Sequence, residues 1–175
     1  YNVLLMDSNY FDSVLNTLNV EINNSLDVLK TKNNKLYNIG LDHFYLNRIE
    51  NANSVFNNVD INIAKVIYRK FKENKNIKIL ELAGGINQLS ILLKKLGFNN
   101  IFPTEYNQGR IDIFNYLNEE LDLNINSCEL NKDIWKLNWN NYDLITVANM
   151  EWRRNNDVER LNEYNLFEDY ILNNN

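Results

Sequence analysis

The stretch Ile79-Leu80-Glu81-Leu82-Ala83-Gly84-Gly85-Ile86-Asn87-Gln88 decides the fold of this chain. It begins inside a short apolar run over 77–82, which predicts a buried strand, and it leads into a helix expected over 88–96. A turn between such a strand and such a helix must be tight, and its backbone must come close to any ligand, so it needs glycine. Gly84 and Gly85 meet that need, although glycine-rich turns also occur for purely structural reasons.

The alternation of strand and helix continues beyond this turn. Further strands are expected over 101–104, 125–130 and 142–148, and further helices over 109–121 and 155–172. Strands separated by helices of this length predict an α/β fold built on a doubly wound parallel sheet. The last strand is apolar enough to be central in that sheet, with neighbours on both sides.

Residues 1–58 show a different pattern, in which apolar residues recur three and four positions apart, as in helices. A further helix is expected over 60–73, with Asp60 as its N-cap. The side chains expected to face the core from that helix are Ile63, Val66, Ile67 and Phe71. We therefore divide the chain into an N-terminal helical cap segment, 1–58, and a strand-and-helix domain, 59–175.

Composition limits the classes of protein that the chain can belong to. Its 175 residues suffice for one domain with a real core, and 45% of them are hydrophobic. The formal net charge is -5 and the 18 Lys and Arg residues are scattered, which makes nucleic acid an unlikely partner. No apolar run approaches the roughly 18 residues of a membrane span. The single cysteine, Cys128, excludes an internal disulfide and a zinc site of the usual spacing, so we expect a cytoplasmic protein without metal.

Two acidic residues follow the later strands at positions that suit a nucleoside. Glu105 closes the second strand, about 20 residues after the glycine turn, where a carboxylate can bind both ribose hydroxyls. Asp133 follows the third strand, where a carboxylate can accept from an adenine amino group. Either acid alone is more often a solvated loop residue. Acids at three successive strand ends, with Glu81 as the first, are far less often accidental.

The segment resembles the class I S-adenosylmethionine (AdoMet)-dependent methyltransferases. Their first motif reads hydrophobic, hydrophobic, acid, any, glycine, any, glycine, any, glycine, and the chain offers 79–87 for it. It keeps the acid, Glu81, and the middle glycine, Gly85. It departs at Ala83 and Asn87, where the family has glycine. Ala83 adds one methyl group, and asparagine accepts left-handed backbone angles better than most residues.

The resemblance implies a Rossmann-like fold with AdoMet as the cofactor, and it covers about 75 residues. Glu81 would meet the amino-acid end of AdoMet, Glu105 would hold the ribose, and the backbone of the turn would pass along the cofactor. The other cofactor-binding positions that the resemblance implies are Ala83, Gly84, Gly85, Asn87, Asp133, Ile134 and Asn149. Asp133 and the backbone at Ile134 would hold adenine, and Asn149 would lie near the methyl donor.

Three alternatives remain open beside a methyltransferase. A dinucleotide dehydrogenase shares the turn, but its fingerprint needs a third glycine, and an acid before the turn suits an ammonium better than a pyrophosphate. The other two are a non-catalytic AdoMet- or nucleoside-binding module completed by a partner chain, and an enzyme that consumes AdoMet by another route. The pattern after residue 148 shows no counterpart of the family's last strands. We therefore expect first that the domain is truncated, and second a homo-oligomer or a partner chain at the exposed sheet edge.

Methyl transfer needs in-line approach more than acid–base residues. Family members that methylate base amino groups carry two prolines after the fourth strand, and the only proline here is Pro103. We therefore expect a small-molecule substrate, with O-methylation favoured. Glu151 is a candidate general base, and Trp152 a candidate substrate wall. His43, the single histidine, is a second candidate base in the cap segment.

Overall fold

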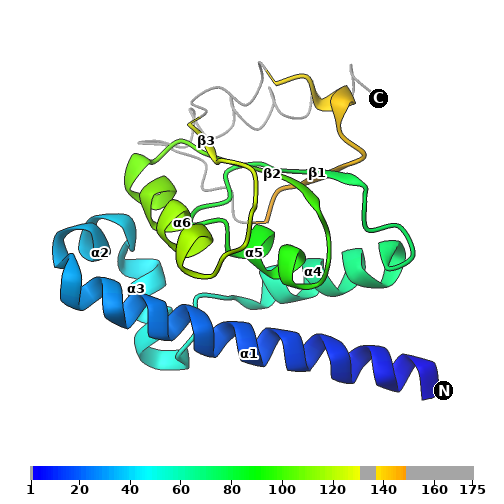
Figure 1. Cartoon of the computed structure of the whole chain (residues 1–175), viewed down its shortest axis with the longest axis horizontal. Helices are drawn as coiled ribbons and strands as arrows, with labels where there is room; N and C mark the ends of the chain where they lie inside the picture. The colour runs from blue at the N-terminus through cyan, green and yellow to red at the C-terminus, as the bar shows by residue number, and fades with distance from the viewer. Residues whose placement is uncertain (1, 131–136, 149–175) are drawn as a thin grey trace, which may run out of the picture.

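The structure is a computed structural model that describes residues 2–130 and 137–148. Its helices are α1 (Asn2–Lys32), α2 (Asn34–Gly40), α3 (His43–Ala52), α4 (Asn58–Phe71), α5 (Gln88–Lys95) and α6 (Gln108–Glu120). Its strands are β1 (Lys78–Glu81), β2 (Asn100–Glu105), β3 (Glu129–Leu130) and β4 (Leu144–Thr146), and a short 3-10 helix, η2, spans Trp139–Asn141. Figure 1 shows α1 running the length of the molecule along one side, with the strands on the other.

The four strands form one open parallel sheet in the order β3-β2-β1-β4. The expected α/β class and parallel pairing are therefore confirmed, and β1 lies inside the sheet between β2 and β4. The last two strands are shorter than the sequence pattern predicts, with two residues in β3 and three in β4. β4 pairs only with β1 among the described residues, so it is an edge strand there rather than a central one.

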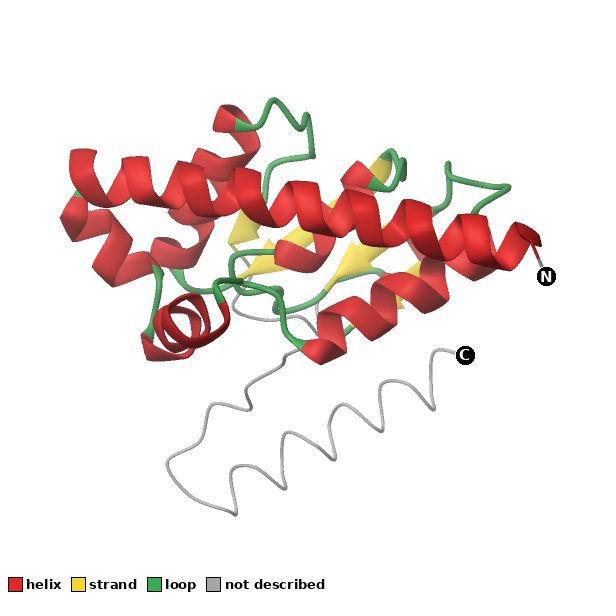
Figure 2. Ribbon diagram, turned by 90° about the horizontal axis from the view of Figure 1, so that it is seen from below, coloured by secondary structure: helices red, strands yellow, loops and turns green. Residues whose placement is uncertain are grey.

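The two faces of the sheet are covered differently. Figures 1 and 2 show α4, α5 and α6 on one face, with α1 crossing outside them. Alternate residues of β1 divide between the faces, so that Ile79 joins the large core beneath the helices and Leu80 points to the opposite face. On that opposite face, Leu80 and Leu82 pack with Trp139 of η2. A second helical layer, which a doubly wound sheet implies, is not found within the described residues.

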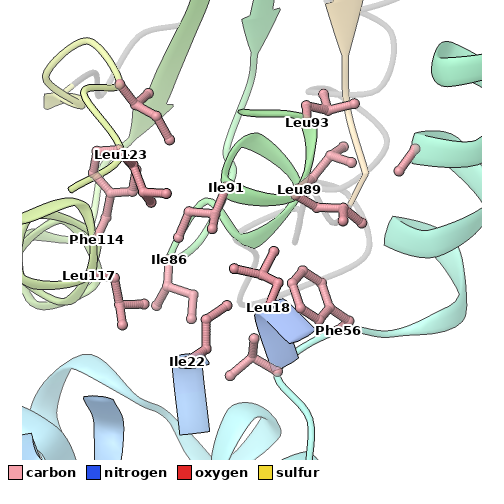
Figure 3. Close-up of a cluster of buried hydrophobic side chains, with 14 of the residues drawn as sticks. Leu18, Ile22, Phe56, Ile86, Leu89, Ile91, Leu93, Phe114, Leu117 and Leu123 are labelled. Carbon is pink, nitrogen blue, oxygen red and sulfur yellow. The ribbon is translucent and has the colours of Figure 1, made fainter. Parts of the chain in front are cut away.

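The N-terminal segment shares one continuous core with the sheet. The first 31 described residues of this segment form one long helix, α1, whose buried stripe includes Leu18 and Ile22. Figure 3 shows both side chains pointing toward Ile86 in the glycine turn, with Leu89 and Ile91 of α5 close by. Residues 1–58 are thus helical as expected, and they are packed directly against the segment that decides the fold.

The start and the buried face of α4 differ from the sequence prediction. Asn57, not Asp60, is the N-cap: its side chain accepts from the backbone N–H of Asp60, and the Asp60 carboxylate accepts from the backbone N–H of Asn57. This reciprocal capping moves the helix start back to residue 58. Val66, expected in the core, is 63% exposed, because the buried stripe of α4 passes through Ala64, Ile67 and Tyr68.

None of the helices within residues 2–130 and 137–148 is both long enough and apolar enough to span a membrane.

Candidate functional site

The carboxyl ends of β1 and β2 lie side by side, because the two strands are parallel and in register from Lys78 opposite Asn100 to Glu81 opposite Pro103. The glycine turn, residues 83–87, leaves β1 at this edge and leads into α5. Glu105 is the last residue of β2. The structure therefore brings Glu81, Gly84, Gly85 and Glu105 together, as the sequence predicts.

The backbone of the turn is left-handed at three alternate positions. The φ angles are 50° at Ala83, 66° at Gly85 and 55° at Asn87. These are the three positions at which the methyltransferase motif has glycine. Ala83 adopts a conformation that costs a non-glycine residue about 1 kcal/mol, and asparagine tolerates it better. The turn thus has the backbone shape that three glycines would favour, although two of them are replaced.

All four backbone N–H groups from Gly84 to Asn87 already donate hydrogen bonds within the chain. Gly84 donates to the carbonyl oxygen of Thr104 at 2.9 Å, and Asn87 donates to that of Gly84 at 2.8 Å. Gly85 donates to Oε2 of Glu105 at 2.6 Å. The fourth, Ile86 N–H, donates to the hydroxyl of Tyr45 at 3.1 Å. In this conformation the turn offers none of these N–H groups to an anion.

Neighbouring side chains leave no room for a Cβ at either glycine of the pair. A Cβ at Gly84 would lie 2.0 Å from Oδ1 of Asn87 and 2.8 Å from the carboxyl carbon of Glu81. A Cβ at Gly85 would lie 2.1 Å from the hydroxyl oxygen of Tyr45. The glycine pair therefore has a structural cause within the chain, and it is not by itself a sign of a ligand.

Glu105 is buried and well supplied with donors. Its side chain is 1% exposed, and Oε1 accepts from the backbone N–H groups of Tyr106 and Asn107 at 2.8 and 3.1 Å. Oε2 accepts from Gly85 and lies 4.0 Å from Nη1 of Arg110. The carboxylate thus joins the end of β2 to the glycine turn and to the start of α6.

Glu81 is equally buried but has fewer donors. Its Oε2 accepts from both the backbone N–H and the hydroxyl of Ser90 in the first turn of α5, and no cation pairs with it among the described residues. Burial raises the pKa of this carboxyl to about 8, and the charges of Asp60 and Glu105 add to the effect, while the Ser90 hydrogen bonds oppose it. The carboxyl is therefore mostly protonated at neutral pH.

Asn87 stands next to Glu81 at the base of the turn and is fully buried. Its Nδ2 donates to Sγ of Cys128 at 3.3 Å. Its Oδ1 is also buried but accepts no hydrogen bond in the described part of the chain. A buried acceptor without a donor is costly, so Oδ1 has unused capacity for one.

The cap segment reaches the turn through Tyr45 of α3, which sequence reasoning did not identify. The Tyr45 hydroxyl accepts from Ile86 and donates to Oε1 of Gln88 at 3.0 Å, while Nε2 of Gln88 donates to Asp60 at 3.1 Å. Burial raises the pKa of the hydroxyl, which keeps it protonated and able to donate. No local pattern around Tyr45 predicts this contact, because its partners lie more than 40 residues away along the chain.

A second contact joins α3 to the site. Asp42 is the N-cap of α3, where it accepts from the N–H groups of Phe44 and Tyr45, and its Oδ2 also pairs with Nη2 of Arg110. Burial alone would raise the pKa of Asp42, but the Arg110 hydrogen bond and charge outweigh it and hold the pKa below its usual value. Arg110 thus lies between Asp42 of the cap segment and Glu105 of β2.

The remaining predicted site residues are not brought to this cluster. His43 is the exposed first residue of α3, and its ring stacks on Phe44 with centroids 4.0 Å apart. The other predicted positions, Asp133, Ile134, Asn149, Glu151 and Trp152, lie outside the described residues. Within residues 2–130 and 137–148, no group of three or more His, Cys, Asp or Glu side chains is arranged to hold a metal ion.

In comparisons with known proteins, no family model, no curated protein and no solved structure matched the chain.

Proposed function

We propose that this chain binds AdoMet at the carboxyl ends of β1, β2 and β4, and that it is an AdoMet-dependent methyltransferase with a small-molecule acceptor. The observation that carries the proposal is the backbone of the turn, whose left-handed residues are Ala83, Gly85 and Asn87. The first methyltransferase motif is difficult to recognise in the sequence alone, because two of its three glycines are replaced in this chain. Retention of positive φ at all three glycine positions supports the view that the turn has kept the motif's shape.

The strand order supports the same place for the ligand. In open parallel sheets of the Rossmann type, ligands bind outside the carboxyl ends of the strands, where the order reverses direction. Here the chain moves from β1 outward to β2 and β3, and then returns to the other side of β1 as β4. The reversal therefore lies at β1, and the glycine turn leaves from it. On this view the sheet is the described part of a Rossmann-like domain.

The chemistry of Glu81 and Asn87 fits the amino-acid end of AdoMet. Among the described residues, the buried carboxyl of Glu81 has no paired cation, and the buried Oδ1 of Asn87 has no donor. Both lie against Gly84. An ammonium group would supply the donor that Oδ1 lacks, and its positive charge would favour the ionised form of the Glu81 carboxyl, which could then accept from it. When bound, AdoMet would supply an electrophilic methyl group, and Glu105 would hold its ribose.

The same geometry argues against a dinucleotide. A pyrophosphate needs free backbone N–H groups at the start of the helix that follows the turn. The N–H groups of Gly84 and Asn87 donate to backbone oxygens, and the N–H of Ser90 in the first turn of α5 donates to the carboxyl of Glu81. An anion there would meet an acidic group instead of free donors.

A non-catalytic AdoMet-binding module is the second candidate, and the position of β4 favours it. β4 is the edge of the described sheet, and an apolar groove runs between β4 and α4, lined by Ile63, Val66, Leu144 and Val147 among others. A partner chain that paired with this edge would complete the sheet. The acceptor side of the site would then come from the partner.

Isothermal calorimetry with AdoMet and with S-adenosylhomocysteine tests the proposal. We expect the chain to bind one or both, and Glu105→Ala to weaken binding by roughly 1–3 kcal/mol because ribose hydroxyls lose their acceptor. Glu50→Ala, which changes an exposed glutamate of α3, is the matched control and should bind like the wild type. Thermal unfolding without ligand shows whether each variant is folded.

Turnover separates the candidate functions. Transfer of the methyl group to a hydroxyl acceptor from a mixed panel supports the methyltransferase. Binding without transfer to any acceptor supports the module, and breakdown of AdoMet without acceptor supports the third alternative, an enzyme that consumes AdoMet by another route. Failure of both AdoMet and S-adenosylhomocysteine to bind the folded wild type would overturn the proposal.

A further inference from the structure

α3 contributes little to the core for a helix of ten residues. Tyr45 is its only buried residue, and Phe44 is 52% exposed. The helix makes no extensive contact with any other described helix or strand. Leu46 and Ile49 pack partly against the core, and the carbonyl oxygen of the C-cap, Asn53, accepts from Asn19 and Asn23 of α1. A helix with a single buried side chain opens more easily than the core around it. Two further attachments of α3 are polar and go to the candidate site.

The first attachment is the Tyr45 hydroxyl, which lies directly against the glycine turn. It accepts from Ile86 at 3.1 Å, and it occupies the space that a Cβ at Gly85 would need. A ligand that approaches the backbone of Gly85 from this side meets the tyrosine first. Tyr45 and a ligand therefore compete for the same face of the turn.

The second attachment is the ion pair of Asp42 with Arg110. Arg110 also lies 4.0 Å from Glu105, whose carboxylate accepts from Gly85 and is 1% exposed. In this conformation no ribose reaches Glu105, because the carboxylate is covered by its own donors. Exposure of Glu105 requires that Gly85 and Arg110 move, and the contacts of α3 hold both in place.

We propose that α3 is a latch, in which the Tyr45 hydroxyl and the Asp42–Arg110 pair hold the glycine turn closed against Glu105 until α3 releases. The entry of a nucleoside when α3 releases is an inference that rests on the proposed function. The closed state of the turn does not rest on the proposed function, because all of the contacts that close the turn lie within the chain. The structure is then the closed state, and the ligand-accepting state is the one in which both attachments are broken.

Hydrogen exchange at two adjacent amides tests the latch without a ligand. Tyr45→Phe removes the acceptor of the Ile86 amide, so that amide exchanges faster in any case. The informative amide is Gly85, whose acceptor is Glu105 and not Tyr45. We expect Gly85 to exchange about 2- to 12-fold faster in Tyr45→Phe, which corresponds to the loss of one ordinary hydrogen bond. An unchanged Gly85 amide would show that Tyr45 is only a local partner of Ile86, and the latch would be wrong.

Tyr116→Phe is the matched control. The Tyr116 hydroxyl donates to the carbonyl oxygen of Ser25 at 2.6 Å and so joins α6 to α1, away from the turn. This variant loses the same chemical group, but the Gly85 amide should exchange as in the wild type. Acceleration of Gly85 by the same factor in both variants would reflect a general loss of stability and would overturn the latch. Asp42→Asn, which keeps an N-cap side chain, should act like Tyr45→Phe.

Calorimetry with AdoMet separates the latch from the proposed function. If both hold, Tyr45→Phe binds AdoMet about 2- to 12-fold more tightly than wild type, because more of the chain is open. If Gly85 exchange rises but neither protein binds AdoMet, the proposed function fails and the latch stands. If both proteins bind AdoMet equally and Gly85 exchange is unchanged, the latch fails and the proposed function stands.

Discussion

Glu81 at the end of β1 and Glu105 at the end of β2 are alike in sequence and burial, with exposed fractions of 2% and 1%, yet they have different surroundings. Glu105 accepts from three backbone N–H groups and lies near Arg110. Within the described part of the chain Glu81 accepts only from Ser90 and has no paired cation, and its pKa is raised to about 8. The fold compensates the charge of one carboxyl and leaves the other without a cation.

The difference shows which of the two acids the closed chain needs. Without the Glu105 carboxylate, three backbone N–H groups would lose their hydrogen-bond acceptor. The folded protein therefore depends on Glu105 whether or not a ligand binds. Glu81 is held by a single residue, and its burial is costly in the charged form. A buried acid that contributes little to its own fold is the better candidate for a ligand contact. Under the proposed function, Glu81 is therefore a stronger candidate for a ligand contact than Glu105.

The largest expected effect is at Glu105. Glu105→Gln turns one oxygen into an amide that cannot accept, so at least one backbone N–H loses its partner. We expect a loss of about 2–4 kcal/mol in the free energy of unfolding, measured by urea denaturation. Glu21→Gln, at a half-exposed ion pair with Lys95, is the control and should change stability little. A loss of less than about 1 kcal/mol in the free energy of unfolding of Glu105→Gln would contradict the structural role assigned to Glu105.

The second prediction concerns the glycine beside Glu105. Gly85→Ala places a Cβ against the Tyr45 hydroxyl at a residue whose φ is 66°, and we expect a loss of about 1–3 kcal/mol. In the double variant with Tyr45→Phe, the oxygen that the Cβ meets is gone, so part of the loss should be recovered. Gly84→Ala, which meets Asn87 and Glu81 instead, should gain nothing from Tyr45→Phe. Equal rescue of both alanine variants would contradict this assignment.

Sequence patterns predict the scaffold of the site well. The apolar run around β1 and the glycines that follow it indicate a parallel sheet, and spacing alone places Glu105 at the neighbouring strand end. These features depend on local periodicity and on the way parallel strands align, which the sequence carries directly. The start of α4 was missed by two residues, because a capping box at Asn57 and Asp60 resembles a simple Asp60 N-cap.

The partners of the site residues could not be predicted in the same way. Tyr45 contacts the turn from 41 residues away, and Arg110 meets Asp42 across 68. Such contacts are set by how the helices pack, not by any local pattern. For the same reason the sequence does not show that Tyr45 leaves no room for a Cβ at Gly85, or that Glu81 has no paired cation among the described residues.

The third prediction is the pH dependence that Glu81 confers. Because its pKa in the folded chain is about 8 and its ordinary value is 4.5, the folded chain keeps a proton that the unfolded chain loses between these values. Stability should therefore fall as pH rises from about 4.5 to 8, and then level off. Glu81→Gln removes this titration, so its free energy of unfolding relative to that of the wild type should rise steadily across that range. A difference that is flat with pH would show that Glu81 titrates alike in the folded and the unfolded chain.

The smallest expected effect is at Asp42, on the Glu105 side of the comparison. Asp42→Asn keeps the N-cap of α3 but removes the charge that pairs with Arg110. Because the Asp42 side chain is 27% exposed, we expect a loss of only about 1 kcal/mol in the free energy of unfolding at neutral pH. The pKa of Asp42 is lowered in the fold, so its contribution is present above the ordinary value of 3.8 and disappears as pH falls through the lower folded value. The difference between Asp42→Asn and wild type should thus vanish in strong acid, whereas that of Glu81→Gln changes between pH 4.5 and 8. Urea denaturation of both variants at pH 3, 5, 7 and 9 separates the two patterns. A difference for Asp42→Asn that is no smaller at pH 3 than at pH 7 would mean that the Arg110 contact is not what holds α3.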